Sequence, residues 1–386
     1  MSHASPGKRP DPSRPVRLRD IAELAGVHVT AVSAVLRGSS RTRTRVSEET
    51  ARRIHELAEA LNYRPHPGAQ AMRSGRTRLI GLLEFGYSEA SMRRTSDLAV
   101  ELRRRGYRVM SHNALWYPSV TEAVNVFLDA RVEGVILVML QAGVGPEELE
   151  PMRRARVPCV AFNGAHLPGL PQVRSDIINS VRELTGHLIH ASRRRRLALL
   201  TPHIRHPESA ERYWPTHERM EGFSAVIREA GGTVEEERLA FAETGPDRPA
   251  GLIVVENPWH GSTHADLGYR AAKRLFDAGV RPDALVCTSD RFAFGAMRAC
   301  FEAGIGVPGP MAIVGVNNEA DTRYYCPALT TVDTLHPEAA VETLELLFAI
   351  LRGEVAPDAP LIRKIPGRLV VRESCGAGGV SSVPSD

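Results

Sequence analysis

The chain has 386 residues, of which 43% are hydrophobic and 24% are charged. This length predicts two or three compact units, and the composition excludes a wholly disordered or fibrous protein. The most continuous apolar run, residues 134–140, is far shorter than the roughly 20 residues that a membrane-spanning helix needs, so we expect no membrane partner. The first 15 residues are polar and rich in proline, without the apolar core of a secretory signal, which predicts a cytoplasmic protein.

Charge is distributed unevenly along the chain. Residues 1–78 hold 15 Lys and Arg residues against 7 Asp and Glu residues, whereas the whole chain has a formal net charge of only +4. The remaining residues therefore have a net charge of −4. A basic head on a mildly acidic body indicates a module that binds a polyanion, joined to a part that does not.

Three short helices are predicted in the basic head. Residues 18–25 place apolar side chains on one helical face, and Gly26 follows where a left-handed helix end is favoured. Residues 28–37 predict a second helix with one apolar face and one small, polar, exposed face. Ser47 is a good N-cap for a third helix. A second helix that follows a glycine-containing turn makes a helix-turn-helix unit, whose second helix can enter the major groove of DNA.

The amino-acid sequence of these segments indicates a function more specifically than their apolar periodicity does. Residues 17–38, RLRDIAELAGVHVTAVSAVLRG, and residues 45–65, RVSEETARRIHELAEALNYRP, resemble the headpiece of the LacI/GalR family of bacterial transcription repressors. The resemblance implies a helix-turn-helix headpiece over residues 17–64 that binds a double-stranded DNA operator. It also implies a hinge over residues 65–78, and we expect residues 1–16 to be a disordered tail.

The family pattern assigns DNA contacts within the headpiece. Four side chains would face the major groove: His28, Val29, Thr30 and Ala34. Ser33 and Arg37 would face phosphates by the same pattern. The turn before the third helix is larger than in the family, and we expect its arginines, Arg41, Arg43 and Arg45, to contact phosphates as well, together with Asn62. Ala34 stands where the family commonly has an arginine, so the preferred operator should differ from the common one. His28 replaces the usual serine, a better cap, and could instead reach a phosphate. The alternative for the arginines of residues 41–45 is a solvated flexible loop.

The segment RPHPGAQAMRSGRTR resembles the family's hinge, which folds into a short helix on operator binding. Pro67 suits a first helical turn, whereas Gly68 and the short span make the isolated helix unstable. Met72 stands at the position of the family's leucine wedge, an apolar side chain that kinks DNA from the minor groove, and Ala69 would approach the groove floor. The alternative is that Met72 packs against its dimer mate.

From Leu79 onward, apolar runs alternate with amphipathic helical stretches in two series, which predicts two buried parallel sheets and an α/β class. The motifs GYRV, RVEGVILV, TSDRFAFGAMRAC, IVGVNN, PALTTVD and RLVVRES resemble the family's effector domain, which has the type I fold of periplasmic binding proteins. The resemblance implies an effector-binding and dimerisation domain over residues 79–375. Its subdomains would be residues 79–189 plus 334–366 and residues 190–333 plus 367–375, followed by a flexible tail, 376–386.

Open parallel sheets bind ligands beyond the carboxyl ends of their strands. The candidates there are Phe85, Tyr87, Asn163, Asp176, Arg219, Trp259, Ser289 and Asn317. Arg219 matches the family's effector-binding arginine in an RxxGF motif and could grip vicinal hydroxyls or a carboxylate; the alternative is an inter-helix salt bridge. We expect Asp290 to be mainly an N-cap. Ser289 and Asn317 replace the family's usual residues, which implies weaker or different polyol recognition.

Three other functions are alternatives to a repressor that is controlled by an effector. An enzyme is disfavoured because GxSxG, HExxH, P-loop and GxGxxG motifs are absent, and we expect no metal and no cofactor. The five cysteines form no CxxC pair, which predicts reduced, mostly buried thiols. A free solute-binding protein should have a signal peptide and no basic head. A regulator that works without a small molecule is the third alternative. The interpretation that we favour is a homodimeric repressor that binds a palindromic operator and has a sugar or related metabolite as its effector.

Overall fold

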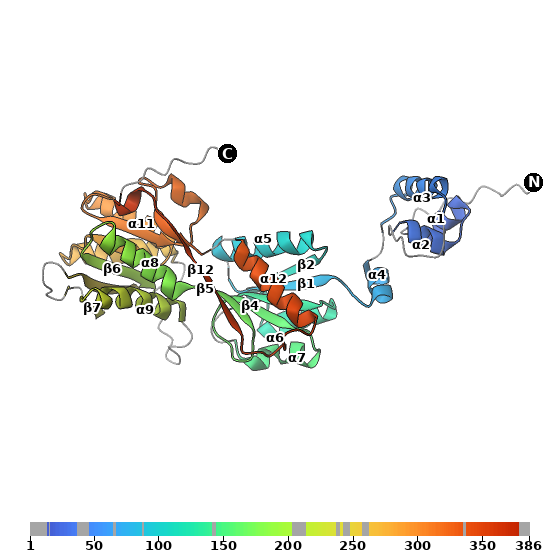
Figure 1. Ribbon diagram of the computed structural model, residues 1–386, viewed down its shortest axis with the longest axis horizontal. Helices are drawn as coiled ribbons and strands as arrows, with labels where there is room; N and C mark the ends of the chain where they lie inside the picture. The colour runs from blue at the N-terminus through green and yellow to red at the C-terminus, as the bar shows by residue number, and fades with distance from the viewer. Residues whose placement is uncertain are drawn as a thin grey trace, which may run out of the picture. The chain divides into compact units, whose positions relative to one another are not determined.

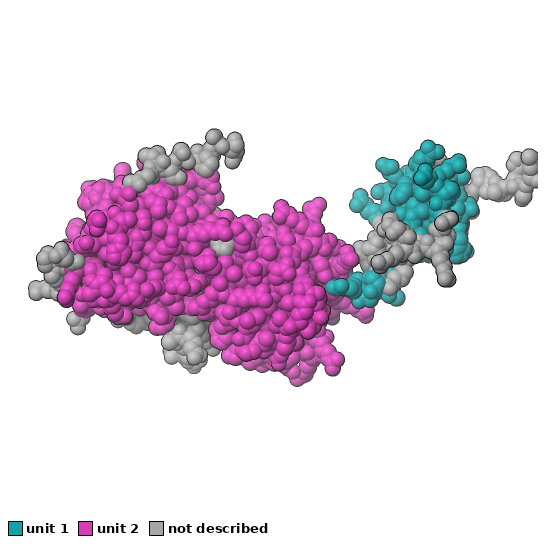
Figure 2. All heavy atoms as spheres, viewed as in Figure 1, with its two compact units in different colours: residues 1–77 teal, residues 78–386 magenta. Residues whose placement is uncertain are grey.

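The computed structural model describes residue 14 and residues 16–36, 46–64, 67–86, 89–140, 144–202, 214–236, 240–241, 248–256, 262–334 and 337–377 (Figure 1). The chain divides into two compact units, residues 1–77 and residues 78–386, which Figure 2 colours separately. In the described ranges, no helix combines the length and the apolar character that crossing a membrane requires.

The first unit contains the predicted helices. They are α1 (Leu18–Ala25), α2 (Val29–Val35), α3 (Glu48–Ala60) and α4 (Pro67–Ser74). Gly26 ends α1 with a left-handed φ of 69°, and the Ser47 hydroxyl accepts a hydrogen bond from the Thr50 N–H at 3.2 Å. Ile21 of α1, Val32 of α2 and Ile54 of α3 form a fully buried centre. The prediction of a three-helix head is therefore confirmed, including its end signals.

An ion pair holds the start of α1. The carboxylate of Asp20 accepts hydrogen bonds from both terminal nitrogens of Arg14, at 2.6 and 2.8 Å, and from the Arg17 N–H at 2.7 Å. Arg14 therefore lowers the pKa of the buried Asp20 to about 2. A carboxylate in the first helical turn also faces the positive end of the helix dipole.

The second unit contains two sheets. The first consists of β1 (Leu79–Glu84), β2 (Arg108–Asn113), β3 (Gly134–Leu140), β4 (Cys159–Gly164), β5 (Gln172–Asp176) and β12 (Ile362–Pro366). Their order is β12-β5-β4-β3-β1-β2, and neighbouring strands are parallel. Near-continuous burial of β1, β3 and β4 follows because helices cover both faces of the sheet.

The second sheet has the order β13-β11-β10-β9-β6-β8-β7. Its strands are β6 (Arg196–Pro202), β7 (Thr233–Glu236), β8 (Ala250–Glu256), β9 (Ala284–Cys287), β10 (Ala312–Val316), β11 (Thr330–Asp333) and β13 (Arg368–Val370). The pairs are parallel apart from β11 with β13, which is antiparallel. The α/β class with two parallel sheets is confirmed.

Each sheet lies between two layers of helices. The first is covered on one face by α5 (Glu89–Arg104) and α12 (Glu338–Leu351), and on the other by α6 (Val120–Asp129) and α7 (Glu150–Arg154). The second is covered by α8 (Ile177–His190) and α9 (Trp214–Glu229) on one face, and by α10 (His264–Asp277) and α11 (Asp290–Glu302) on the other. Short 3₁₀ turns lie at Ala114–Trp116, Pro146–Leu149, Ala320–Tyr324 and Glu373–Cys375.

The chain passes between the two sheets at the carboxyl ends of β5, β11 and β12. The first passage comes earlier than expected. Val181, Leu184 and Leu188 of α8 pack in the core of the second sheet, so the change of sheet falls at Asp176 rather than at residue 189. The expected boundary at residue 189 is therefore wrong by the length of α8. The apolar face of α8 is visible in the sequence, but the sequence does not say which sheet that face covers.

Two glycines allow α10 and α11 to touch through their backbones. A Cβ on Gly295 would lie 1.9 Å from the Ala265 carbonyl oxygen and 2.7 Å from the Tyr269 nitrogen. A Cβ on Gly268 would lie 2.1 Å from the Phe292 carbonyl oxygen. Both neighbours are backbone atoms, so neither helix can yield without moving as a whole.

We expect Gly295→Ala to lower the free energy of unfolding by about 3 kcal/mol, because the added methyl forces the two helices apart. Gly186→Ala in α8 is the matched control. Its Cβ would lie 4.0 Å from the nearest atom, in the His190 ring, so the change should raise the free energy of unfolding by up to about 1 kcal/mol. Urea titrations followed by circular dichroism measure both, and equal stabilities for the two variants would contradict the close helix contact.

Candidate functional site

The exposed surface of α2 is its first turn. His28, Val29 and Thr30 are exposed, and they are the residues expected to face base edges. His28 also caps the helix, because its Nδ1 lies 2.8 Å from the Thr30 hydroxyl and accepts from the Thr30 N–H at 3.4 Å. An imidazole cap and two side chains able to reach bases thus share one turn of helix.

Two other predicted DNA contacts are placed differently. Ser33 and Ala34 are only 7% and 5% exposed. The expectation that they belong to an exposed face of the second helix is wrong, because Ala31 through Ala34 are all buried. Neither side chain presents a surface to DNA in this conformation.

The remaining headpiece candidates divide into described and undescribed residues. Asn62 is exposed just after α3 and has a left-handed φ of 50°, a conformation that asparagine tolerates at helix ends. Arg37, Arg41, Arg43 and Arg45 lie outside the described residues. Their assignment to phosphates stays a prediction.

The hinge segment contains α4, which begins at Pro67 as the sequence predicts. Met72 is 89% exposed, and Ala69 is exposed as well. A large apolar side chain so open to water is available for another molecule to cover.

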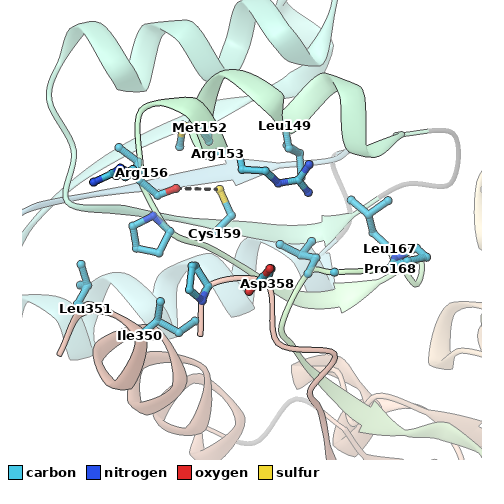
Figure 3. Close-up of a pocket in the computed structure, with 15 residues that line it drawn as sticks. Leu149, Met152, Arg153, Arg156, Cys159, Leu167, Pro168, Ile350, Leu351 and Asp358 are labelled. Atoms are coloured by element: carbon cyan, nitrogen blue, oxygen red, sulfur yellow. Dashed lines mark hydrogen bonds between the residues drawn. The ribbon is translucent and has the colours of Figure 1, made fainter. Parts of the chain in front are cut away.

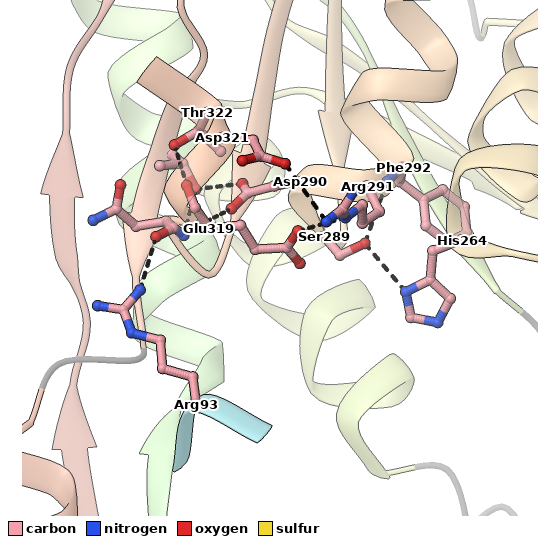
Figure 4. A network of polar contacts seen from close by, with 11 residues as sticks. Arg93, His264, Ser289, Asp290, Arg291, Phe292, Glu319, Asp321 and Thr322 are labelled. Carbon is pink, nitrogen blue, oxygen red and sulfur yellow. Dashed lines mark hydrogen bonds and ion pairs between the residues drawn. The ribbon is translucent and has the colours of Figure 1, made fainter. Parts of the chain in front are cut away.

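In the second unit, the junction between the two halves is made of polar contacts near strand ends. Arg93 of α5 donates to the Asn318 carbonyl oxygen at 3.2 Å, beyond β10 (Figure 4). Arg94 donates to the Thr334 carbonyl oxygen at 3.2 Å. Arg174 of β5 pairs with Glu218 of α9 at 2.9 Å, and both side chains are nearly buried. We call this region the junction; it includes the carboxyl ends of both sheets.

Four of the predicted effector residues accept hydrogen bonds at the junction, three of them from backbone N–H groups and Asn317 from a side-chain hydroxyl. The Asn163 side-chain oxygen accepts from the Ser175 N–H at 2.7 Å, and Asn317 accepts from the Thr334 hydroxyl at 2.9 Å. Asp176 caps α8, and Ser289 caps α11. The structure brings them to the strand ends as expected, and each already has a local role there. The side-chain nitrogen of Asn163 is buried without a partner in the described part of the chain.

Phe85 does not face the junction. It is 6% exposed and packs with Leu83, Ala123 and Phe127 on the α6 side of the first sheet. The prediction of Phe85 as an effector contact is wrong, because strand alternation carries it to the same face as the buried Leu83. Tyr87 and Trp259 lie outside the described residues.

Arg219 of α9 is the predicted residue that the structure leaves most in need of a ligand. Burial lowers its pKa to about 10, so it stays charged at neutral pH while poorly hydrated. Its Nε is buried, and the described residues offer that atom no hydrogen-bond partner. Glu218, the carboxylate whose charge acts on Arg219, is already paired with Arg174. The alternative of an inter-helix salt bridge is not what the described residues show.

Arg94 was missed by the sequence analysis. It is 5% exposed, and burial lowers its pKa to about 10, with the charges of Arg93 and Arg219 acting in the same direction. Two poorly hydrated guanidinium groups therefore lie within electrostatic reach of each other. The sequence could not separate Arg94 from its neighbour Arg93, because the hydrogen-bond partners of Arg94, Ser175 and Thr334, are far away along the chain.

Asp290 has a different role from the expected N-cap. The helix begins at Asp290 itself, and Ser289 is the cap (Figure 4). The fully buried carboxylate accepts from the Thr331 hydroxyl at 2.6 Å and from the Glu319 N–H at 2.7 Å. It thereby ties α11 to β11 and to the loop after β10. Burial raises the pKa of Asp290 to about 6, although both hydrogen bonds oppose the rise.

The raised pKa of Asp290 predicts a pH effect on stability. The folded protein binds this proton more tightly than the unfolded chain does, so the stabilisation is complete below pH 4 and is lost as the pH rises through about 6. The free energy of unfolding of the wild type should fall by on the order of 2 kcal/mol relative to that of Asp290→Asn between pH 4 and pH 7. Urea titrations across this range test it, and parallel pH profiles for the two proteins would contradict it.

Comparisons with known proteins match both units. The model described as bacterial regulatory proteins, lacI family, matches residues 17–66. The model described as a periplasmic binding protein-like domain matches residues 185–375. The first covers α1 to α3, and the second covers most of the second sheet and its helices.

Similar whole proteins carry the same pair of parts. The HTH-type transcriptional repressor PurR of Actinobacillus pleuropneumoniae serotype 3 (strain JL03) is 27% identical over 371 residues, which cover 92% of this chain and 97% of that protein. PurR of Glaesserella parasuis serovar 5 (strain SH0165) is 26% identical over 367 residues, with the same coverage. The structure of the lac repressor dimer bound to operator and an anti-inducer is 20% identical with a TM-score of 0.71, covering 94% of this chain and 99% of that one.

A helix-turn-helix head joined to a two-sheet binding-protein fold defines a DNA-binding transcription regulator rather than an enzyme. The matches extend through both parts in the same order. Both parts of this chain are similar to those of LacI-family regulators, and the resemblance seen in the sequence is confirmed.

Proposed function

We propose that the protein is a homodimeric repressor that binds a palindromic operator and is controlled by a small molecule at the junction. The observation that carries the proposal is that one chain holds both an exposed turn able to contact bases, residues 28–30, and an arginine, Arg219, whose buried Nε has no hydrogen-bond partner among the described residues. The relatives reported above are named repressors, which supports the direction of control.

Only a small part of α2 is exposed and able to contact DNA. One turn with His28, Val29 and Thr30 can contact only a few base edges, with Val29 suited to a thymine methyl and Thr30 to a hydrogen bond. A second copy on the other half-site doubles the contacts and explains a palindromic site. Arg37, Arg41, Arg43, Arg45 and Asn62 would supply phosphate contacts, so operator affinity should fall steeply with salt.

Residues 17–64 act as the headpiece in this proposal, and residues 65–78 act as the hinge. The exposed Met72 would insert between base pairs in the minor groove, with Ala69 against the groove floor. An eight-residue helix is too short to be stable alone, so contacts with DNA and with a second hinge would hold α4.

Met72→Asp should reduce specific operator affinity by about 100-fold or more, because a charged side chain cannot enter the base stack. Ser74→Asp adds the same charge to the same helix and should cost far less. Its hydroxyl accepts from the Arg76 N–H at 3.2 Å and donates to the Arg76 carbonyl oxygen at 3.0 Å, and an aspartate carboxylate can take over the accepting role. Gel-shift titrations against a selected operator compare the two, and equal losses would refute the wedge.

We expect Arg219 to be the main contact for the effector. A charged, poorly hydrated guanidinium is stabilised by a ligand oxygen that accepts its hydrogen bonds, and its fork matches a carboxylate or a pair of vicinal hydroxyls. The second poorly hydrated arginine, Arg94, adds positive potential to the same region. Sugars, nucleosides and sugar acids are therefore the classes that we propose for the effector.

A thermal-shift screen with monosaccharides, nucleosides and gluconate should give at least one compound that raises the melting temperature of the wild type. Arg219→Gln should weaken that compound's binding by about tenfold or more, as expected for loss of a charge-assisted hydrogen bond. Arg228→Gln, an exposed position near the end of the same helix, should leave the binding unchanged. A screen without any hit would favour a repressor that works without a small molecule.

A further inference from the structure

A pocket of about 490 Å³ opens at the amino end of β4 in the first sheet (Figure 3). The effector proposed above belongs at the carboxyl strand ends, so this pocket is a separate feature. Its size is typical of sites for small organic ligands. No residue of the junction lines it.

The register of the sheet explains why the pocket exists. β5 pairs with β4 only from Ala161 onward, so Cys159 and Val160 have no neighbour on that side. The helices on the two faces, α7 and α12, do not close the gap between them. Its floor consists of buried apolar side chains from both faces and from the chain between β4 and β5: Leu149, Met152, Leu167, Leu170 and Ile350.

Charged groups lie only at the rim of this floor. Arg153, Arg156 and Asp358 line the pocket and are exposed. Arg153 pairs with Glu150 at 3.2 Å. For Arg156 and Asp358, the described part of the chain shows neither an ion pair nor a side-chain hydrogen bond. An apolar interior with two guanidinium groups and one carboxylate at its mouth complements an elongated apolar molecule that ends in an anionic group.

We propose that this pocket binds a medium-chain or aromatic monocarboxylate, with its apolar body on Met152 and Leu170 and its carboxylate at Arg156. The ligand removes its own apolar surface from water, and the guanidinium gives its charge a fixed partner. Binding here does not depend on the identity of the operator or of the ligand at the junction.

The pocket is connected to the root of the hinge by backbone hydrogen bonds. The carbonyl oxygen of Pro158, in the pocket wall, accepts from the Val135 N–H at 2.9 Å. Two residues earlier, the Glu133 N–H donates to the Leu79 carbonyl oxygen at 2.8 Å, and its carboxylate accepts from the Arg78 N–H at 2.7 Å. A ligand that fixes the start of β4 therefore steadies the residues through which the hinge joins the body.

The test uses decanoate as the probe and the full-length protein with ¹³C-methyl methionine. Met152 is the only methionine among the described residues that line the pocket, so its methyl signal, assigned with Met152→Leu, reports occupancy of this site. Decanoate should shift that signal saturably. Arg156→Gln should weaken the binding by about fivefold or more, and Arg154→Gln, an exposed neighbour outside the pocket that pairs with Glu150, should not. Hydrogen exchange of the Arg78 amide should slow at least about twofold on binding.

Each alternative result is informative. An unshifted Met152 signal at millimolar decanoate, or equal affinities for the wild type and Arg156→Gln, overturns the site. Tighter binding of decylamine than of decanoate overturns the choice of an anion. Saturation of Met152 with unchanged exchange at Arg78 overturns the connection to the hinge.

Discussion

The body of this protein depends on one topological constraint, which is that the chain changes sheets only at the carboxyl ends of strands. Passage after β5, β11 and β12 brings the carboxyl edges of both sheets to a single junction. The polar side chains that end these strands must then be satisfied in each other's company. Asn163 with Ser175, Asn317 with Thr334 and Arg174 with Glu218 meet this need. The buried atoms in this region that have no hydrogen-bond partner among the described residues include the side-chain nitrogen of Asn163 and the Nε of Arg219 on α9.

In the headpiece, by contrast, few residues are available both to form a core and to contact DNA. Its apolar centre is small and includes Val32 of α2, and Ala31 through Ala34 are all buried. What remains for DNA is the first turn, residues 28–30. In the proposed function, a second copy and the hinge add the discrimination that so small an exposed surface lacks. The lac repressor structure compared above is a dimer bound to operator.

The sequence predicted the headpiece helices and the alternation of strands and helices, because capping residues, apolar periodicity and buried runs are local signals. It did not predict which side chains of these elements are buried. Ser33 and Ala34 lie on positions that periodicity assigns to a polar face, yet both are buried. Phe85 follows the alternation of β1 into the core, and this alternation is a local pattern in the sequence. The burial of Arg94 depends on partners 81 and 240 residues away, which no local pattern contains.

The order of the last strands has a consequence for synthesis of the protein. β12 completes the edge of the first sheet beside β5, and β13 completes the second beside β11, although the two strands are neighbours in the chain. A ribosome must therefore release residues 362–370 before either half of the body is finished, whereas the headpiece can fold as soon as it emerges. A nascent chain would carry a folded DNA reader attached to two incomplete sheets with open edges, so loss of a short C-terminal piece should damage both halves at once.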